Sequence, residues 1–90
     1  MEELYKMIED KIHASGYKGY VSGEDIYNEI CDEIEEKEEG SYIFMSKKED
    51  DVIYEYKIDV MEDQFNLSYL DIKSNGETYH IDFDNLEYKF

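Results

Sequence analysis

The chain has 90 residues, 41% of them hydrophobic, and a formal net charge of −16 at pH 7, because 25 Asp and Glu residues face nine basic residues. This length fits one small domain with little room for a deep catalytic cleft, so we expect residues 1–90 to form a single domain that is not an enzyme. The hydrophobic content is too high for a disordered acidic tail.

The basic residues, the apolar runs and the single cysteine exclude several classes of protein. Arg is absent and Lys47-Lys48 is the only adjacent basic pair, so we expect no direct binding to nucleic acid. No apolar run approaches the ~20 residues of a membrane span, and anionic lipid would repel this chain. The lone Cys31 and the acidic start after Met1 predict a cytosolic protein without disulfides.

Two segments before Gly40 have apolar residues at helical spacing. These residues are Leu4, Ile8 and Ile12 in the first segment and Ile26, Ile30 and Ile34 in the second. Ser15-Gly16 predicts the end of the first helix. Ser22 predicts the N-cap of the second helix, which we expect to continue to Gly40.

After Gly40 the apolar residues alternate, most clearly from Val52 to Val60, which predicts strands. The expected strands are residues 42–46, 52–60, 65–73 and 78–83. Asn75-Gly76 predicts a type I′ hairpin turn. The fold class is therefore α+β, with two N-terminal helices packed on one face of a four-stranded antiparallel meander, ααββββ.

The third strand and the C-terminal tail leave alternatives open. Phe65, Leu67 and Tyr69 point one way while Leu70 and Ile72 point the other, which indicates a bulge or burial on both faces. Residues 84–90 alternate again and form either a short edge strand or a cover over the core. The oligomeric state stays open, including dimerisation through exposed Ile53, Leu70 or Ile72.

Nine acids lie in residues 24–39 against Lys37 alone, so half of the net charge falls in this segment. With the isoleucines facing inward, carboxylates four residues apart recur every ~6 Å along the outer side, close to the spacing of phosphates on one nucleic-acid strand. The need for solubility explains any single carboxylate on the surface. A run of like charges, however, destabilises a helix. This cost favours a second role for the run, which is to bind a cationic partner. The candidate partner-binding carboxylates are Asp25, Glu29, Asp32, Glu33, Glu36, Glu39, Glu49, Asp50 and Asp51.

Tyr17 and Tyr20 lie in the loop before the acidic helix. Tyrosine is enriched in binding hot spots, so both are candidate contact residues, with covering the end of the helix pair as the competing role.

The sequence shows no pattern for catalysis or metal binding. His13, His80 and Cys31 match no zinc spacing, and the acids at 49–51 and 82–87 lack the EF-hand pattern. We therefore expect no catalytic residue, no metal and no cofactor.

The small size, the missing Arg, the acidic second helix and the small α+β layout resemble phage-encoded inhibitors of bacterial defence, of the anti-CRISPR or DNA-mimic type. The resemblance rests on size and composition and transfers no residue roles. It implies an inhibitor in the host bacterial cytosol that blocks the basic nucleic-acid-binding surface of a Cas effector or other defence nuclease, with carboxylates in place of phosphates.

Two other classes stay open. An immunity protein or antitoxin would neutralise a basic toxin enzyme without nucleic-acid mimicry. A small enzyme or metal-binding module would keep its activity when single surface acids are neutralised.

Overall fold

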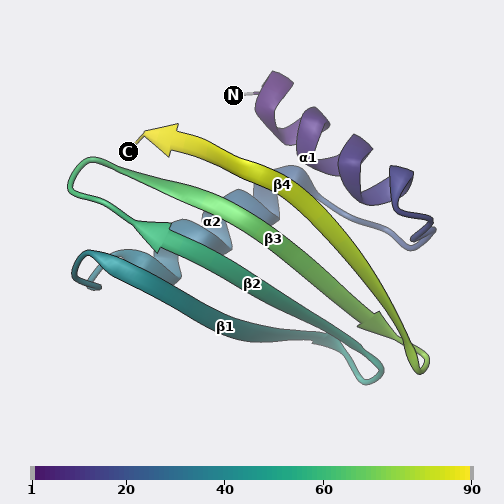
Figure 1. Ribbon diagram of the computed structural model, residues 1–90. Helices are drawn as coiled ribbons and strands as arrows, with labels where there is room; N and C mark the ends of the chain where they lie inside the picture. Colours follow the sequence, from purple (N-terminus) through teal and green to yellow (C-terminus); the bar gives the residue numbers. More distant parts are fainter. Residues whose placement is uncertain (1, 90) are drawn as a thin grey trace. The chain divides into compact units, whose positions relative to one another are not determined.

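A computed structural model describes residues 2–89, with side chains described for residues 2–83 (Figure 1). The elements are α1 (Glu2–Ala14), α2 (Gly23–Ile34), β1 (Gly40–Glu49), β2 (Val52–Val60), β3 (Gln64–Ser74) and β4 (Glu77–Lys89). The chain divides into two compact units, a helical unit (Met1–Lys37) and a sheet unit (Glu38–Phe90). The predicted α+β class and the order of two helices followed by a four-stranded antiparallel sheet are confirmed.

α1 buries the apolar stripe that the sequence predicts and ends where expected. Ile8 and Ile12 are both 0% exposed. After Ala14, the backbone N–H of Gly16 donates to the carbonyl of His13 at 3.0 Å, and Gly16 has a φ of 103°. This left-handed conformation suits glycine and closes the helix.

α2 begins as predicted but ends earlier. The Ser22 hydroxyl accepts a hydrogen bond from the backbone N–H of Asp25 at 3.2 Å, which confirms the N-cap. The expected end at Gly40 is wrong, because the helix ends at Ile34 and Gly40 begins β1. The last turn has no basic residue and acids follow it, so negative charges gather at the negative end of the helix dipole and oppose its extension.

The two helices approach closely at the start of α2. The Glu9 carboxylate of α1 accepts a hydrogen bond from the backbone N–H of Gly23 at 2.8 Å. A Cβ on Gly23 would lie 2.1 Å from the Tyr5 carbonyl oxygen. The rings of Tyr5 and Tyr27 pack with centroids 5.9 Å apart. Glycine at position 23 therefore permits the helix contact, and Glu9 supplies a second cap.

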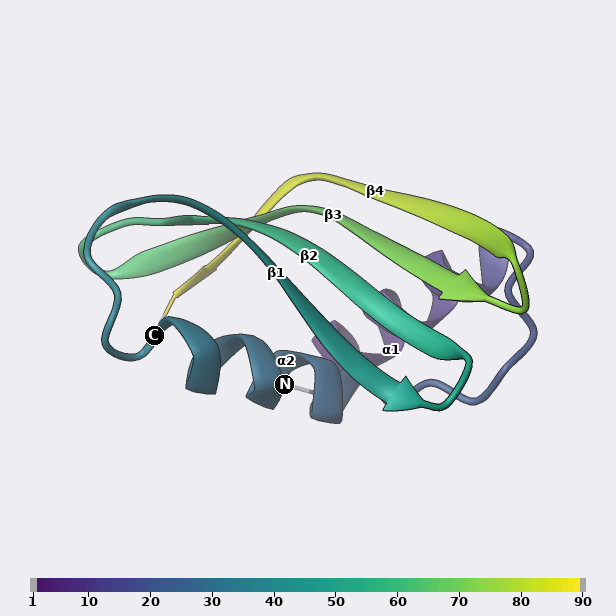
Figure 2. The ribbon, with the colours of Figure 1, turned by 90° about the horizontal axis from the view of Figure 1, so that it is seen from below.

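The sheet is an antiparallel meander in the order β1-β2-β3-β4, and Figure 2 shows its twist. β2 has the predicted bounds and alternates between buried and half-buried residues along its whole length. The other three strands extend beyond their predicted bounds by one or more residues at each end. In the turn between β3 and β4, Asn75 and Gly76 have φ values of 53° and 81°, as the predicted type I′ turn requires.

The predicted bulge lies at Ser68 in β3. The pairing with β2 passes from Lys57 opposite Tyr69 to Ile58 opposite Leu67, which leaves Ser68 as the extra residue. The shift turns the apolar residues on both sides of it to the same face, and the following are all 0% exposed: Phe65, Leu67, Leu70 and Ile72. Leu70 and Ile72 are therefore buried and do not offer the exposed surface through which dimerisation was left open.

Of the two alternatives for the C-terminal tail, an edge strand or a cover over the core, the structure shows the edge strand. β4 continues through residues 84–89, where Leu86 pairs with Leu67 and Glu87 with Asn66, so the tail extends an edge strand. Phe90 lies outside the described residues.

Candidate functional site

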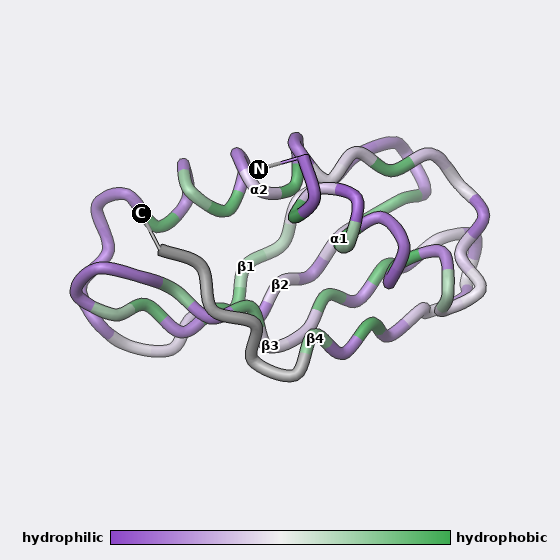
Figure 3. Tube along the Cα trace, turned by 90° about the horizontal axis from the view of Figure 1, so that it is seen from above, coloured by the Kyte–Doolittle hydropathy of each residue, from purple (hydrophilic) through white to green (hydrophobic). Residues whose placement is uncertain are grey.

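The acidic helix surface consists of three exposed residues of α2, Asp25, Asp32 and Glu33. Figure 3 shows hydrophilic and hydrophobic positions alternating along this helix, as expected for one apolar stripe. Ile26, Ile30 and Ile34 form that stripe, each at most 2% exposed. Asp25 and Asp32 are seven residues apart, which places them about 10 Å apart along the axis.

The carboxylates of this surface are not neutralised by the protein's own side chains. Within the described part of the chain, Asp25, Asp32 and Glu33 have no ion-pair or hydrogen-bond partner for their carboxylates. Their charge is therefore available to a partner of opposite sign.

Glu29, which the sequence analysis grouped with these residues, is half-buried and interacts within the protein. Each residue turns a helix by about 100°, so Glu29 lies nearer the margin of the apolar stripe than Asp25 or Asp32. It therefore presents less of its charge than its sequence spacing suggests.

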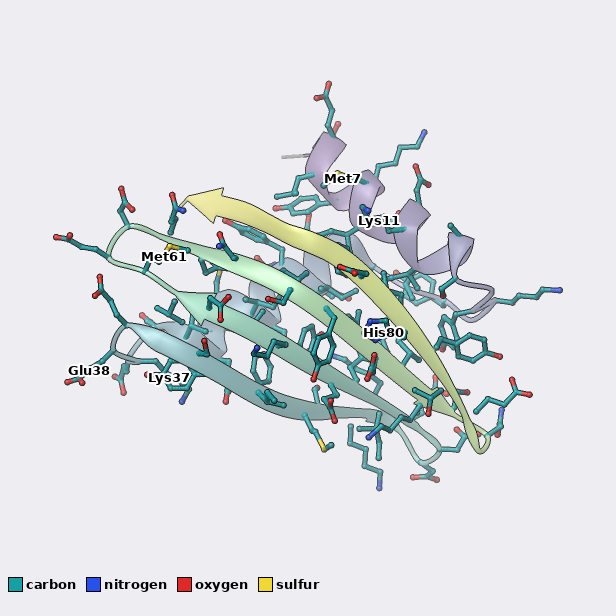
Figure 4. The ribbon with its side chains drawn as sticks, in the orientation of Figure 1. Met7, Lys11, Lys37, Glu38, Met61 and His80 are labelled. Carbon is teal, nitrogen blue, oxygen red and sulfur yellow. The ribbon has the colours of Figure 1, made fainter. Side chains whose placement is uncertain are left out.

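Glu36 and Glu39 lie in the connection between α2 and β1, outside regular structure. Both are exposed, as are Glu35, Lys37 and Glu38. Figure 4 labels Lys37 and Glu38 in this connection. These acids continue the negative charge past the end of α2, with Lys37 as the one basic residue among them.

Glu49 is the last residue of β1, Asp50 and Asp51 form the turn to β2, and all three are exposed. Lys48 just before them stacks its ammonium over the Tyr54 ring, 5.2 Å from the centroid. This turn belongs to the sheet unit and forms a second acidic surface in its own right.

The two candidate tyrosines have different environments. Tyr17 is 8% exposed, and a Cβ on Gly19 would lie 2.3 Å from its hydroxyl oxygen, so its ring packs over that glycine. Tyr20 is 86% exposed. Tyr20 is therefore the one of the two that offers its ring to a partner.

The half-exposed face of the sheet carries a polar cluster that sequence analysis missed. Glu55 accepts a hydrogen bond from the Tyr69 hydroxyl at 3.1 Å and pairs with the Lys73 ammonium at 3.3 Å. Asp71 pairs with His80, whose ring lies 5.2 Å from that of Tyr69 and is labelled in Figure 4. Burial, with the hydrogen bond to Glu55, raises the pKa of Tyr69. These carboxylates have partners on their own sheet, unlike those of the acidic helix surface.

The sequence feature that indicates this cluster is the break in apolar alternation at residues 65–72. The break places Tyr69 on the opposite face of the sheet from the buried Leu70. The partners could not be named from sequence, because they depend on the register of three strands.

Cys31 is half-buried, and burial raises the pKa of its thiol. Among the described residues, no group of three or more His, Cys, Asp and Glu side chains is arranged to hold a metal ion. No described helix is long and apolar enough to cross a membrane.

Comparison of the chain with protein-family models, curated proteins and solved structures found no match.

Proposed function

We propose that this protein is an acidic inhibitor of a bacterial defence effector, of the anti-CRISPR or anti-restriction type. It binds the basic surface that the effector uses for DNA or RNA and blocks access by presenting carboxylates in place of phosphates. Binding and exclusion suffice for this activity, so no catalytic step is required.

One observation carries the proposal: half of the net charge of −16 lies in residues 24–39, and part of it is displayed on an ordered helix. Asp25, Asp32 and Glu33 are exposed and unpaired within the described residues, whereas Glu55 and Asp71 on the sheet are paired. A protein that used acids only for solubility would gain nothing by concentrating them on one helix, where like charges cost stability.

The mechanism follows from electrostatics. A surface lined by Lys and Arg attracts a strongly negative protein over a distance of about 10 Å, which speeds encounter. On contact, the carboxylates replace phosphates as partners of the target's cations. Tyr20, at 86% exposed, adds contact area that does not depend on charge.

The test is affinity capture with the purified chain as bait in bacterial lysate, repeated with an excess of duplex DNA or of RNA. We expect a nucleic-acid-binding effector that the competitor displaces, and we expect the eluted effector to lose nucleic-acid binding when the chain is added back. Capture of a basic enzyme that nucleic acid does not displace would contradict mimicry and support the immunity-protein or antitoxin function instead.

A further inference from the structure

β1 is an edge strand, and its first seven residues, 40–46, lack the usual protection against pairing with another strand. It has one strand neighbour among the described residues, β2, so one row of its backbone N–H and C=O groups faces outward. Proteins commonly protect such edges with charges, prolines or bulges. Residues 40–46 contain no charge and no proline, and the register shift of β1 lies after them, between Lys47 and Glu49.

This uncharged run is also exposed. Ile43 and Met45, on the same face of β1, are each 59% exposed, in a chain of which 38% is charged. The other uncharged run of equal length, residues 64–70, lies in β3, an interior strand. The apolar residues of β1 therefore lie at an edge where a second strand can cover them.

Two copies of the β1 segment can pair in antiparallel orientation with compatible side chains opposite each other. In an antiparallel pair of two copies centred on Ile43, Phe44 of one copy faces Tyr42 of the other, and Met45 faces Ser41. The same register brings Lys47 opposite Glu39, the residue just before β1, so this lysine lies across from an acid of the other copy. Lys48 follows at the register shift with β2 and is not part of this regular pairing. The register centred on Ile43 also pairs odd-numbered residues with odd-numbered residues, which keeps both copies' Ile43 and Met45 on one face of the joined sheet.

We propose that two copies of the chain pair edge to edge through β1, antiparallel and centred on Ile43, to form a two-fold symmetric dimer with a continuous sheet. The net charge of −16 on each copy opposes association, but residues 38–48 contain two acids and two lysines, so the charges cancel where the copies meet. Opposite charges across paired strands stabilise the pairing.

The assembly closes at two copies. A two-fold contact uses the same edge on both copies, which leaves β4 as the outer edge at each end. β4 carries four acids, Glu77, Asp82, Asp84 and Glu87, and one lysine, Lys89. Pairing of β4 with itself would therefore bring like charges together.

Sedimentation equilibrium of the purified chain tests the proposal, which does not depend on the proposed function. We expect a dimer for the wild type and a monomer for Ile43→Lys, because the variant places two ammonium groups opposite each other at the two-fold axis. The matched control is Ile53→Lys on the interior strand β2, which should remain a dimer. Circular dichroism checks that each variant folds. A monomeric wild type, or a folded Ile43→Lys that remains a dimer, would overturn the proposal.

Charge exchange tests the register. Glu39→Lys and Lys47→Glu, studied separately, should each weaken the dimer, because each opposes like charges in its own homodimer. An equimolar mixture of the two variants should restore it, because both pairs in the mixed dimer then join opposite charges. A mixture that associates no better than the separate variants would rule out pairing centred on Ile43.

Discussion

At the scale of single residues, the carboxylates divide by whether the protein itself supplies a partner. Glu55 meets Tyr69 and Lys73, and Asp71 meets His80. Asp25 and Asp32 have no such partner among the described residues. The sequence shows where acids are dense but does not show which are paired, because pairing depends on strand register and on the turn of each helix position.

Tyr69 gives a prediction for alkaline pH. Burial and the hydrogen bond to Glu55 raise its pKa, so the folded protein holds the phenolic proton more tightly than the unfolded chain. Above about pH 9 the unfolded chain begins to lose this proton first, and the free energy of unfolding should fall as pH rises further. Denaturant titrations at increasing pH should show this fall, and Tyr69→Phe should make it shallower. An equally steep fall in the variant would contradict this assignment.

Cys31 gives a prediction for thiol reactivity. Burial and the nearby charge of Asp32 raise the pKa of the thiol, which lowers the fraction of reactive thiolate. Alkylation by iodoacetamide at about pH 8 should therefore be slower for the folded protein than for the same protein in urea. Asp32→Asn should raise the rate in the folded protein, because it removes a charge that raises the pKa of the thiol. Equal rates with and without urea would show that the thiol is neither shielded nor perturbed.

At the scale of elements, alternation and spacing predicted most of the fold. Three features were predicted correctly because they depend on residues close together in the sequence: the N-cap at Ser22, the bounds of β2 and the turn at Asn75-Gly76. The end of α2 was predicted from Gly40, but the run of acids after Ile34 opposes extension before any glycine is reached. The close approach of Gly23 to Tyr5 is a tertiary contact that no local pattern contains.

Gly23→Ala tests this helix contact. The added Cβ would lie 2.1 Å from the backbone carbonyl oxygen of Tyr5, and backbone cannot move aside as the end of a side chain can. We expect a loss of about 1 to 3 kcal/mol in the free energy of unfolding, measured by urea denaturation. The control is Asn28→Ala at an exposed position of the same helix, which should leave stability unchanged or slightly increased. Stability equal to wild type in Gly23→Ala would mean that the helices do not approach so closely.

At the scale of the whole molecule, the net charge of −16 favours association with positively charged molecules and opposes association with negatively charged ones. Composition alone predicted that the protein does not bind nucleic acid through phosphate contacts, and it favoured a basic partner. It could not separate a solvated surface from a binding surface, since that distinction requires knowing which carboxylates lack partners.

Salt dependence follows from the proposed mechanism. If carboxylates of the acidic helix surface pair with target cations, affinity for the captured effector should fall steeply between low and physiological ionic strength, because exposed charges are screened beyond about 8 Å at 0.15 M. Biolayer interferometry across a salt series measures this. A flat dependence would indicate an interface built on Tyr20 and other uncharged contacts.

The most direct measurement compares two charge reversals of equal size in the same helical unit. Asp25, Asp32 and Glu33 on α2 are changed to Lys in one variant, and the exposed Glu2, Glu3 and Asp10 on α1 are changed to Lys in the other. The quantity measured is the ability of each folded variant to displace DNA or RNA from the captured effector. We predict that the α2 variant loses displacement and the α1 variant keeps most of it. Equal loss in both variants, or none in either, would contradict the assignment of phosphate mimicry to α2.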